Sequence, residues 1–400
     1  MTETSLPETL PPGGWRDDAG LTRLCTALGG GEAARFVGGA VRDSLLGMAV
    51  KDVDIATVHR PEAVMERLKA AGIRAVPTGM AHGTVTAILP AGPVEITTLR
   101  HDVATDGRHA TVAFASDWQQ DAARRDFTMN ALYADPETGA IHDYFDGRAD
   151  LSAARVRFIG DAGTRIDEDH LRILRYFRFL ARFGHADAAS RDYAACVDKA
   201  ATLMALSRER VADELLKLLG TADPVPALRL MIDGGIFVPI VPEAMTDGVD
   251  RVAALILRER AMGEAPDGLL RLTALLPTDP AVADKVAARL KLSNKARARI
   301  ATALGEAIDG DARLLAYRLG TRGALDRIAL GRALSPGDAR LLAEWAVPRL
   351  PVGGGDLIAR GLPAGPEVAR TLRALEEKWI AAGYPGREHT LELADQLLER

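Results

Sequence analysis

The chain has 400 residues, of which 48% are hydrophobic and 26% charged, and its formal net charge is −5. One hydrophobic core seldom serves more than about 250–300 residues, so this length predicts two or three domains. No apolar run reaches the ~18 residues that a membrane span needs, and no basic start precedes an apolar stretch, so we expect neither a membrane protein nor a secreted one. Cys25 and Cys196 fit neither a disulfide framework nor a zinc cluster and indicate a cytoplasmic protein.

Residues 1–20 are predicted to form a leader, which is loose over residues 1–14. Between 21 and 150, helical stretches alternate with short segments whose Val, Ile and Thr content is typical of strands. A turn with Asp-Pro and Thr-Gly at 134–144 predicts a closing hairpin. The sequence therefore predicts an α+β head with a small mixed sheet, whose strand-like segments are ARFVGG (34–39), DVDIATV (52–58), TVTAIL (84–89), VEITTL (94–99) and TVAF (111–114).

After residue 150 the strand-like segments stop, and apolar residues recur every three or four positions, as in 171–183 and 211–219. We expect an all-helical neck over 151–225 and a helical body and tail over 226–400. One stretch, 281–300, is strongly basic and contains a single acid, Asp284. It is either a solvated helix face or a surface for a polyanion, and its basic residues are Lys285, Arg289, Lys291, Lys295, Arg297 and Arg299.

Two motifs in the head carry chemistry. Gly38 and Gly39 join an apolar strand to a helix, where backbone N–H groups and the helix N-terminus favour a phosphate, although ordinary turn chemistry also explains two glycines there. Asp52 and Asp54 lie two residues apart in a strand-like segment, so both carboxylates are expected on one face. Such close like charges are stable when a cation lies between them, and oxygen ligands without His or Cys favour Mg²⁺. Alone, an Asp-x-Asp pair is also typical of solvated turns.

The combination of these motifs resembles a known family. Gly-Gly-Ala-Val-Arg-Asp at 38–43 followed by Asp52-x-Asp54 is similar to the signature of the polymerase-β-type nucleotidyltransferase superfamily. More narrowly, the chain resembles the bacterial CCA-adding tRNA nucleotidyltransferase and poly(A) polymerase family of class II. Three later segments agree in order and spacing, so that the resemblance covers about residues 35–220: RRDFTMNA (124–131), EDHLR (168–172) and LSRER through ELLK (206–217).

For the head, the resemblance implies a nucleotidyltransferase that uses Mg²⁺ held by Asp52 and Asp54 for in-line transfer. Glu95 is implied as a third catalytic carboxylate, with an ordinary outward-facing strand glutamate as the alternative. Gly39 and Arg42 are implied to hold the triphosphate, for which a planar guanidinium is well suited.

Arg124 and Arg125 are implied to contact phosphate or ribose, and a structural ion-pair cluster is the alternative. Asn130 is expected to bond sugar or phosphate, or to satisfy buried backbone groups instead.

For the neck, the resemblance assigns base selection to Asp169 and Arg172. The carboxylate accepts from the exocyclic amino group of C or A, and the guanidinium donates to the adjacent ring nitrogen. Uracil and guanine present a carbonyl and an N–H there, so both contacts fail. Arg175 and Arg178 follow at helical spacing on a helix with many apolar residues, and we expect them to line the same nucleotide-binding cleft.

The family resemblance implies tRNA as partner, CTP and ATP as substrates, and a helical body that clamps the acceptor arm through phosphates and shape. Family members add CCA, only CC, only A, or poly(A). The segment 100–110 lies where the family has a flexible loop that helps the site to switch from C to A, and its apparent full length favours complete CCA addition. A non-catalytic RNA-binding scaffold and a transferase acting on another acceptor are the competing hypotheses.

Overall fold

The computed structural model describes residues 6–106, 109–115 and 117–399, and it divides into two compact units. In the part of the chain that is described, no helix is both long enough and apolar enough to cross a membrane. The first unit comprises Met1–Asp250, Pro266–Pro277 and Val286–Leu292; the second comprises Arg251–Ala265, Thr278–Lys285 and Ser293–Arg400.

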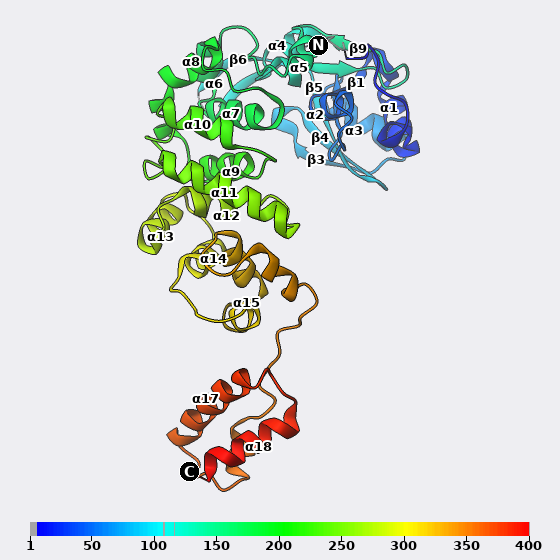
Figure 1. Ribbon diagram of the computed structural model, residues 1–400. Helices are drawn as coiled ribbons and strands as arrows, with labels where there is room; N and C mark the ends of the chain where they lie inside the picture. Colours follow the sequence, from blue (N-terminus) through cyan, green and yellow to red (C-terminus); the bar gives the residue numbers. More distant parts are fainter. Residues whose placement is uncertain (1–5, 107–108, 116, 400) are drawn as a thin grey trace. The chain divides into compact units, whose positions relative to one another are not determined.

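A seven-stranded mixed sheet forms the centre of the head (Figure 1). Its spatial order is β3-β4-β5-β2-β1-β8-β9, in which β2 and β5 are parallel and the other neighbours are antiparallel. This arrangement confirms the predicted α+β class with a small mixed sheet. The strands are β1 (Ala34–Val37), β2 (Asp54–Thr57), β3 (Ala75–Gly79), β4 (Thr84–Leu89), β5 (Gly92–Thr98), β8 (Leu132–Ala134) and β9 (Ile141–Asp143).

Helices cover the sheet unequally. Helix α3 (Pro61–Ala70) packs against β3, β4 and α1 (Ala19–Leu28), and Val85 and Ala87 of β4 are completely buried. A separate apolar cluster joins β1 and β2 to α4 (Trp118–Ala123) through Val37, Ala56 and Ala122. Helices α2 (Gly39–Leu45) and α5 (Gly147–Ser152) complete the head.

The described part of the leader is not loose. Leu10 N–H donates to the Gly139 carbonyl at 2.8 Å, and Ile141 N–H donates to the Glu8 carbonyl at 2.9 Å, so this segment continues the sheet beside β9. Trp15 packs edge-on against Phe36 with ring centroids 4.8 Å apart. The expectation of a loose segment over residues 1–14 is thus wrong for residues 8–10, because an exposed strand edge offers unpaired backbone groups to a neighbouring segment.

Two strands lie in segments that the sequence did not identify as strands. Strand β3 contains Pro77, which is tolerated because β3 is at the sheet edge. Strand β6 (Arg100–Asp106) pairs with β7 (His109–Phe114) as a separate hairpin, in the segment expected to be a flexible loop. Gly107 and Arg108, part of that expected loop, lie outside the described residues.

The neck is helical, as predicted. Helix α7 (Arg172–Phe183) packs against α9 (Arg208–Leu219) and α10 (Val225–Asp233) and buries Ile173, Leu174 and Phe177. The unit also contains α6 (Ala162–Glu168), α8 (Arg191–Asp198) and α12 (Gly268–Leu275).

The second unit consists of helices with two apolar clusters of its own, around Leu315 and Leu375. Helix α17 begins at Pro366 after Gly365, as the sequence predicted. Helices α11 (Thr246–Met262) and α13 (Pro280–Arg289) contribute residues to both units. The remaining helices are α14 (Asn294–Leu304), α15 (Ala312–Ala329), α16 (Gly354–Ile358), α17 (Pro366–Ala381) and α18 (Arg387–Leu398).

Candidate active site

A cavity of about 400 Å³ lies within the first unit and collects most of the predicted site residues. Its walls come from the β1–α2 turn, the start of β2, the segment after α4, and the segment from Asp169 to Phe179 of α7. The predicted site residues that line it are Gly39, Arg42, Asp54, Arg124, Arg125, Asn130, Asp169, Arg172 and Arg175; Gly38, Asp126 and Phe179 line it as well. Motifs that are up to 137 residues apart in the sequence, from 38 to 175, therefore meet in one cavity.

The β1–α2 turn requires glycine. Gly38 has φ 71° and ψ −123°, a conformation that residues with a Cβ rarely adopt, and its N–H donates to the Leu132 carbonyl at 3.1 Å. The turn brings the first N–H groups of α2, which have no partner within the helix, to the cavity wall. Gly38 therefore permits a turn that a residue with a Cβ would adopt only with strain, and this turn lies against the cavity.

The carboxylates expected to bind metal lie at and beside the start of β2. Asp54 is the first residue of the strand and pairs in register with Glu95 of the parallel strand β5. Burial raises the pKa of Asp54, as does the Glu95 carboxylate; Arg125 opposes this and Asp52 adds to it. Two further negative charges thus act on a half-buried carboxylate, and this donor set suits a divalent cation.

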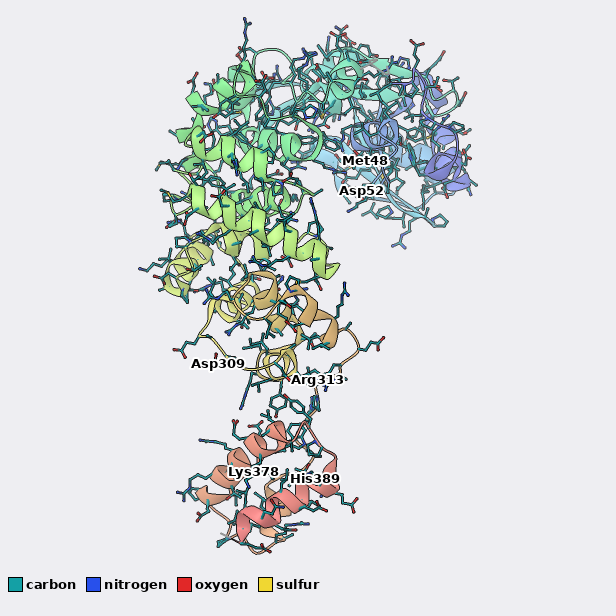
Figure 2. The ribbon with its side chains drawn as sticks, in the orientation of Figure 1. Met48, Asp52, Asp309, Arg313, Lys378 and His389 are labelled. Carbon is teal, nitrogen blue, oxygen red and sulfur yellow. The ribbon has the colours of Figure 1, made fainter. Side chains whose placement is uncertain are left out.

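Asp52 does not share the strand with Asp54, because β2 begins only at Asp54. It is exposed in the segment that follows Met48 (Figure 2) and borders a different hollow, together with Lys51 and Pro93. Glu95 is also exposed and does not line the cavity. Within the described ranges, no three His, Cys, Asp or Glu side chains are close enough to hold a metal together. Mg²⁺ is commonly held by one or two carboxylates completed by substrate phosphates and water, so the residues present fit it without such a trio.

Arg42 is held firmly in the cavity wall. It is 5% exposed, donates to Asp43 at 2.8 Å and to Asn130 Oδ1 at 2.5 Å, and lies 4.3 Å above the ring of Phe183. Burial lowers the pKa of Arg42, whereas Asp43 raises it and Arg182 lowers it further. The Asn130 amide in turn donates to Asp126 at 2.9 Å, so Asn130 links side chains and does not serve the backbone.

Asp121 organises the two adjacent arginines. Its carboxylate, 1% exposed, accepts from Arg124 at 2.7 Å, from Arg125 at 3.2 Å and from the Tyr133 hydroxyl at 2.6 Å. The ion-pair cluster considered as the alternative is thus present, and both arginines still line the cavity. Asp121 was not predicted as a site residue, although its position three and four residues before two arginines is the helical spacing of an ion pair.

The neck supplies the other wall. Asp169 accepts from Arg210 at 2.8 Å, and Arg172 bonds Glu168 and the carbonyl of Arg165, the latter at 2.9 Å. Each member of the predicted selecting pair is therefore fixed by a different partner. Both side chains line the cavity.

Arg175 and Arg178 differ in their positions. Arg175 lines the cavity and bonds Asp126 at 2.6 Å. Arg178 does not line it, and it bonds Glu214 of α9 at 2.6 Å. Arg178 therefore lies behind the cavity wall, over the ring of Phe179 at 4.7 Å, and the buried Glu214 carboxylate holds its guanidinium there.

Comparisons with known proteins agree with this geometry. Residues 34–157 match the family model described as the poly A polymerase head domain, and residues 193–247 match the one described as a probable RNA and SrmB-binding site of polymerase A. The chain is 37% identical over 369 residues to the mitochondrial CCA tRNA nucleotidyltransferase 1 of Mus musculus, covering 88% of this chain and 83% of the relative. It is 31% identical over 372 residues to a CCA-adding enzyme of Lacticaseibacillus paracasei, covering 89% and 90%.

A solved structure agrees as well. The Bacillus stearothermophilus CCA-adding enzyme in complex with CTP has a TM-score of 0.76 and 28% identity, covering 95% of this chain and 97% of that one. The long relatives extend the match through the helical half, which the motifs alone did not reach. The chain therefore belongs to the family of CCA-adding tRNA nucleotidyltransferases, which share the poly(A) polymerase head.

Proposed function

We propose that this protein adds CCA to the 3′ end of tRNA from CTP and ATP, without a nucleic-acid template, with Mg²⁺ as its metal and pyrophosphate as the second product. The observation that carries the proposal is the single cavity in which Asp54, Arg125 and the pair Asp169 and Arg172 meet. A phosphate-binding wall and a base-reading wall face one space there. Family membership supports the same reaction.

In this proposal the head binds the triphosphate and the neck reads the base. Arg124 and Arg125, held by Asp121, present cationic groups to phosphate, and Arg42 keeps the wall at the glycine turn in place. Asp52 and Asp54 would hold the metal. Glu95, in register with Asp54, would add a third negative charge beside them. Mg²⁺ bound there would stabilise charge on the attacking and leaving oxygens.

Base choice follows from the hydrogen-bond inventory of the second wall. Asp169 accepts from the amino group of cytosine or adenine, and Arg172 donates to the neighbouring ring nitrogen. Because Arg210 and Glu168 already fix these two side chains, little ordering is needed when a nucleotide binds. Uracil and guanine leave both groups without a matching partner, which excludes them.

The test supplies purified protein with tRNA lacking its 3′ CCA, Mg²⁺ and each nucleotide, separately and together. CTP alone should add two residues, CTP with ATP three, and UTP or GTP none. Products that stop at CC, that gain A only on tRNA ending in CC, or that extend beyond one A would indicate a CC-adding, A-adding or poly(A)-adding enzyme.

The metal assignment has its own variants. Asp52→Asn and Asp54→Asn should each lower the rate of CTP addition by at least about 10³-fold, since a displaced metal removes several kcal/mol of transition-state stabilisation. Binding of tRNA should change little. The matched control is Asp309→Asn, an exposed aspartate of the second unit (Figure 2). Activity retained in Asp54→Asn would refute the assignment.

We also propose that the protein works in the cytoplasm. Both cysteines, Cys25 and Cys196, are free and buried, which a reducing compartment favours. Because several relatives are mitochondrial proteins, fractionation of cells and detection of the protein in each fraction is the test.

A further inference from the structure

One face of the β3–β4–β5 half of the sheet is partly exposed. Along β4 the side chains alternate: Val85 and Ala87 are buried on the face that α3 covers, and Ile88, on the opposite face, is 40% exposed. Val76 of β3, in register with Thr86, is 37% exposed. We call this side the threonine face, and its residues are Val76, Thr78, Thr84, Thr86, Ile88, Glu95 and Thr97.

The threonine face continues the row of catalytic carboxylates. Asp54 is in register with Glu95, and Glu95 is in register with Thr86 of β4. The Thr86 hydroxyl is 2.8 Å from that of Thr78 on β3. Neighbouring strands are ~4.8 Å apart, so the row runs about 14 Å from Asp54 to Thr78.

The geometry of nucleotidyl transfer indicates from which side of Asp54 the attacking hydroxyl approaches. In an in-line displacement the attacking hydroxyl and the leaving pyrophosphate lie on opposite sides of the α-phosphorus. The nucleotide cavity takes its head residues from β2, the β1–α2 turn and the segment before β8, all on one side of Asp54 in the strand order. The attacking 3′ hydroxyl therefore comes from the other side, which is the side of β5, β4 and β3.

The chemistry of the face suits a phosphodiester strand. Thr86 is 8% exposed and Thr78 is exposed. One hydroxyl proton is used between them, so the pair has a second proton to donate to a phosphate oxygen. Arg74 precedes β3 and its carbonyl accepts from Ile88 N–H at 2.8 Å, so strand alternation places it on the same face as Val76 and Thr78. Arg74 is exposed, which leaves a cation at the far end of the row.

We propose that the threonine face binds the 3′-terminal strand of the RNA acceptor, with Thr78 and Thr86 as positioning residues that hold its last phosphate so that the 3′ hydroxyl is directed toward Asp54, and with Arg74 contacting a phosphate farther from the 3′ end. This inference rests on the proposed function, since it names the track of the acceptor for the same site.

The first test uses Thr78→Val and Thr86→Val, which remove a hydroxyl and keep the β-branched shape that suits a strand. Each variant should raise KM for tRNA lacking CCA about fivefold, the equivalent of one hydrogen bond, and leave KM for CTP unchanged. Thr9→Val, an exposed threonine beside the opposite edge of the sheet, is the matched control. Thermal unfolding verifies that each variant is folded.

A second test needs no turnover. We would measure Kd by fluorescence anisotropy for tRNA lacking CCA and for the same tRNA shortened by one more 3′ nucleotide. The wild-type protein should lose about fivefold in affinity on shortening, and the double variant Thr78→Val/Thr86→Val should lose almost nothing, because the contact is already absent. Arg74→Ala should lower the slope of log K against log salt by about 0.7–0.9, and Arg67→Ala, exposed on α3, should leave the slope unchanged.

The outcomes separate the two proposals. If the wild-type protein adds CCA and the threonine variants keep the wild-type KM for tRNA, the face does not bind the acceptor. The inference is then wrong, and the proposed function stands. A rise in KM for CTP in parallel with that for tRNA also overturns it, because the face would then serve the nucleotide. If the wild-type protein adds nothing to tRNA, the proposed function fails, and equal shortening penalties in wild type and double variant would then reject the inference separately.

Discussion

At the scale of residues, the site depends on carboxylates that hold arginines in place. Asp121, Asp126, Glu168 and Glu214 each bond at least one arginine in or behind the cavity. An arginine with two or three fixed hydrogen bonds loses little side-chain entropy when it meets phosphate. The cationic cavity is therefore organised before a nucleotide binds.

Asp121→Asn tests this role. Although burial alone raises it, the pKa of Asp121 lies below its usual value because Arg125, Arg124 and the Tyr133 hydroxyl favour the charged carboxylate. Such a group stabilises the fold above its unfolded pKa of about 3.9, and the contribution is lost as pH falls through the lower folded pKa. At pH 7 the variant should lose about 3 kcal/mol in the free energy of unfolding, measured in urea.

The pH dependence provides the control for this prediction. The difference between wild type and Asp121→Asn should be constant from about pH 5 to 7 and should shrink below about pH 4, where the Asp121 carboxyl of the unfolded chain takes up a proton while the folded protein keeps it charged. Asp309→Asn should show no such difference. If the difference in unfolding free energy between the two proteins is the same at pH 3 as at pH 7, the shape of the Asp121 side chain, and not its charge, explains the lower stability of the variant.

At the scale of elements, the β1–α2 turn and helix α7 position the cavity. The turn places α2 against one wall, and α7 lines the other with Arg172, Arg175 and Phe179 while packing its apolar side on α9. The helical periodicity of α7 was visible in the sequence. The start of β2 at Asp54 was not, because a Val between two aspartates fits a strand and a preceding loop equally well.

Gly38→Ala tests the turn. At φ 71° and ψ −123° a Cβ is strained, and it would lie 3.5 Å from an Arg125 nitrogen. We expect a loss of about 1–3 kcal/mol in unfolding free energy together with a raised KM for CTP. Gly39→Ala is the matched control for stability, since Gly39 has no positive φ and its nearest neighbour to an added Cβ is an Arg42 nitrogen at 3.7 Å. Equal melting temperatures for the two variants would contradict the requirement for glycine at 38.

At the scale of the whole molecule, net charge says little about RNA binding. Four of the six basic residues of the stretch 281–300 are ion-paired: Arg289 with Glu243, Lys291 with Glu209, Arg297 with Asp284, and Arg299 with Asp326. Most of that stretch is therefore structural, which the sequence could not decide. Lys285 and Lys295 have no ion pair with any described residue, and both belong to the second unit.

We expect the double variant Lys285→Ala/Lys295→Ala to weaken tRNA binding. Each lost phosphate contact should reduce the slope of log K against log salt by about 0.9, so the pair should reduce it by nearly 2. KM for CTP should not change, because neither lysine lines the nucleotide cavity. Lys69→Ala, exposed on α3 of the head, is the control, and an unchanged salt slope in the double variant would exclude these lysines from the RNA contact.

The sequence by itself determined the α+β class and the helical neck, because glycine turns, strand composition and helical periodicity are local properties, and the resemblance of its motifs to a known family indicated most residues of the cavity. Only the tertiary structure decided which partners hold those residues. Asp43 bonds Arg182, Asp126 bonds Arg175, and Asp169 bonds Arg210, pairs separated by 139, 49 and 41 positions. Such pairings depend on how strands and helices pack, and packing is set by the burial of many side chains together, which no local pattern contains.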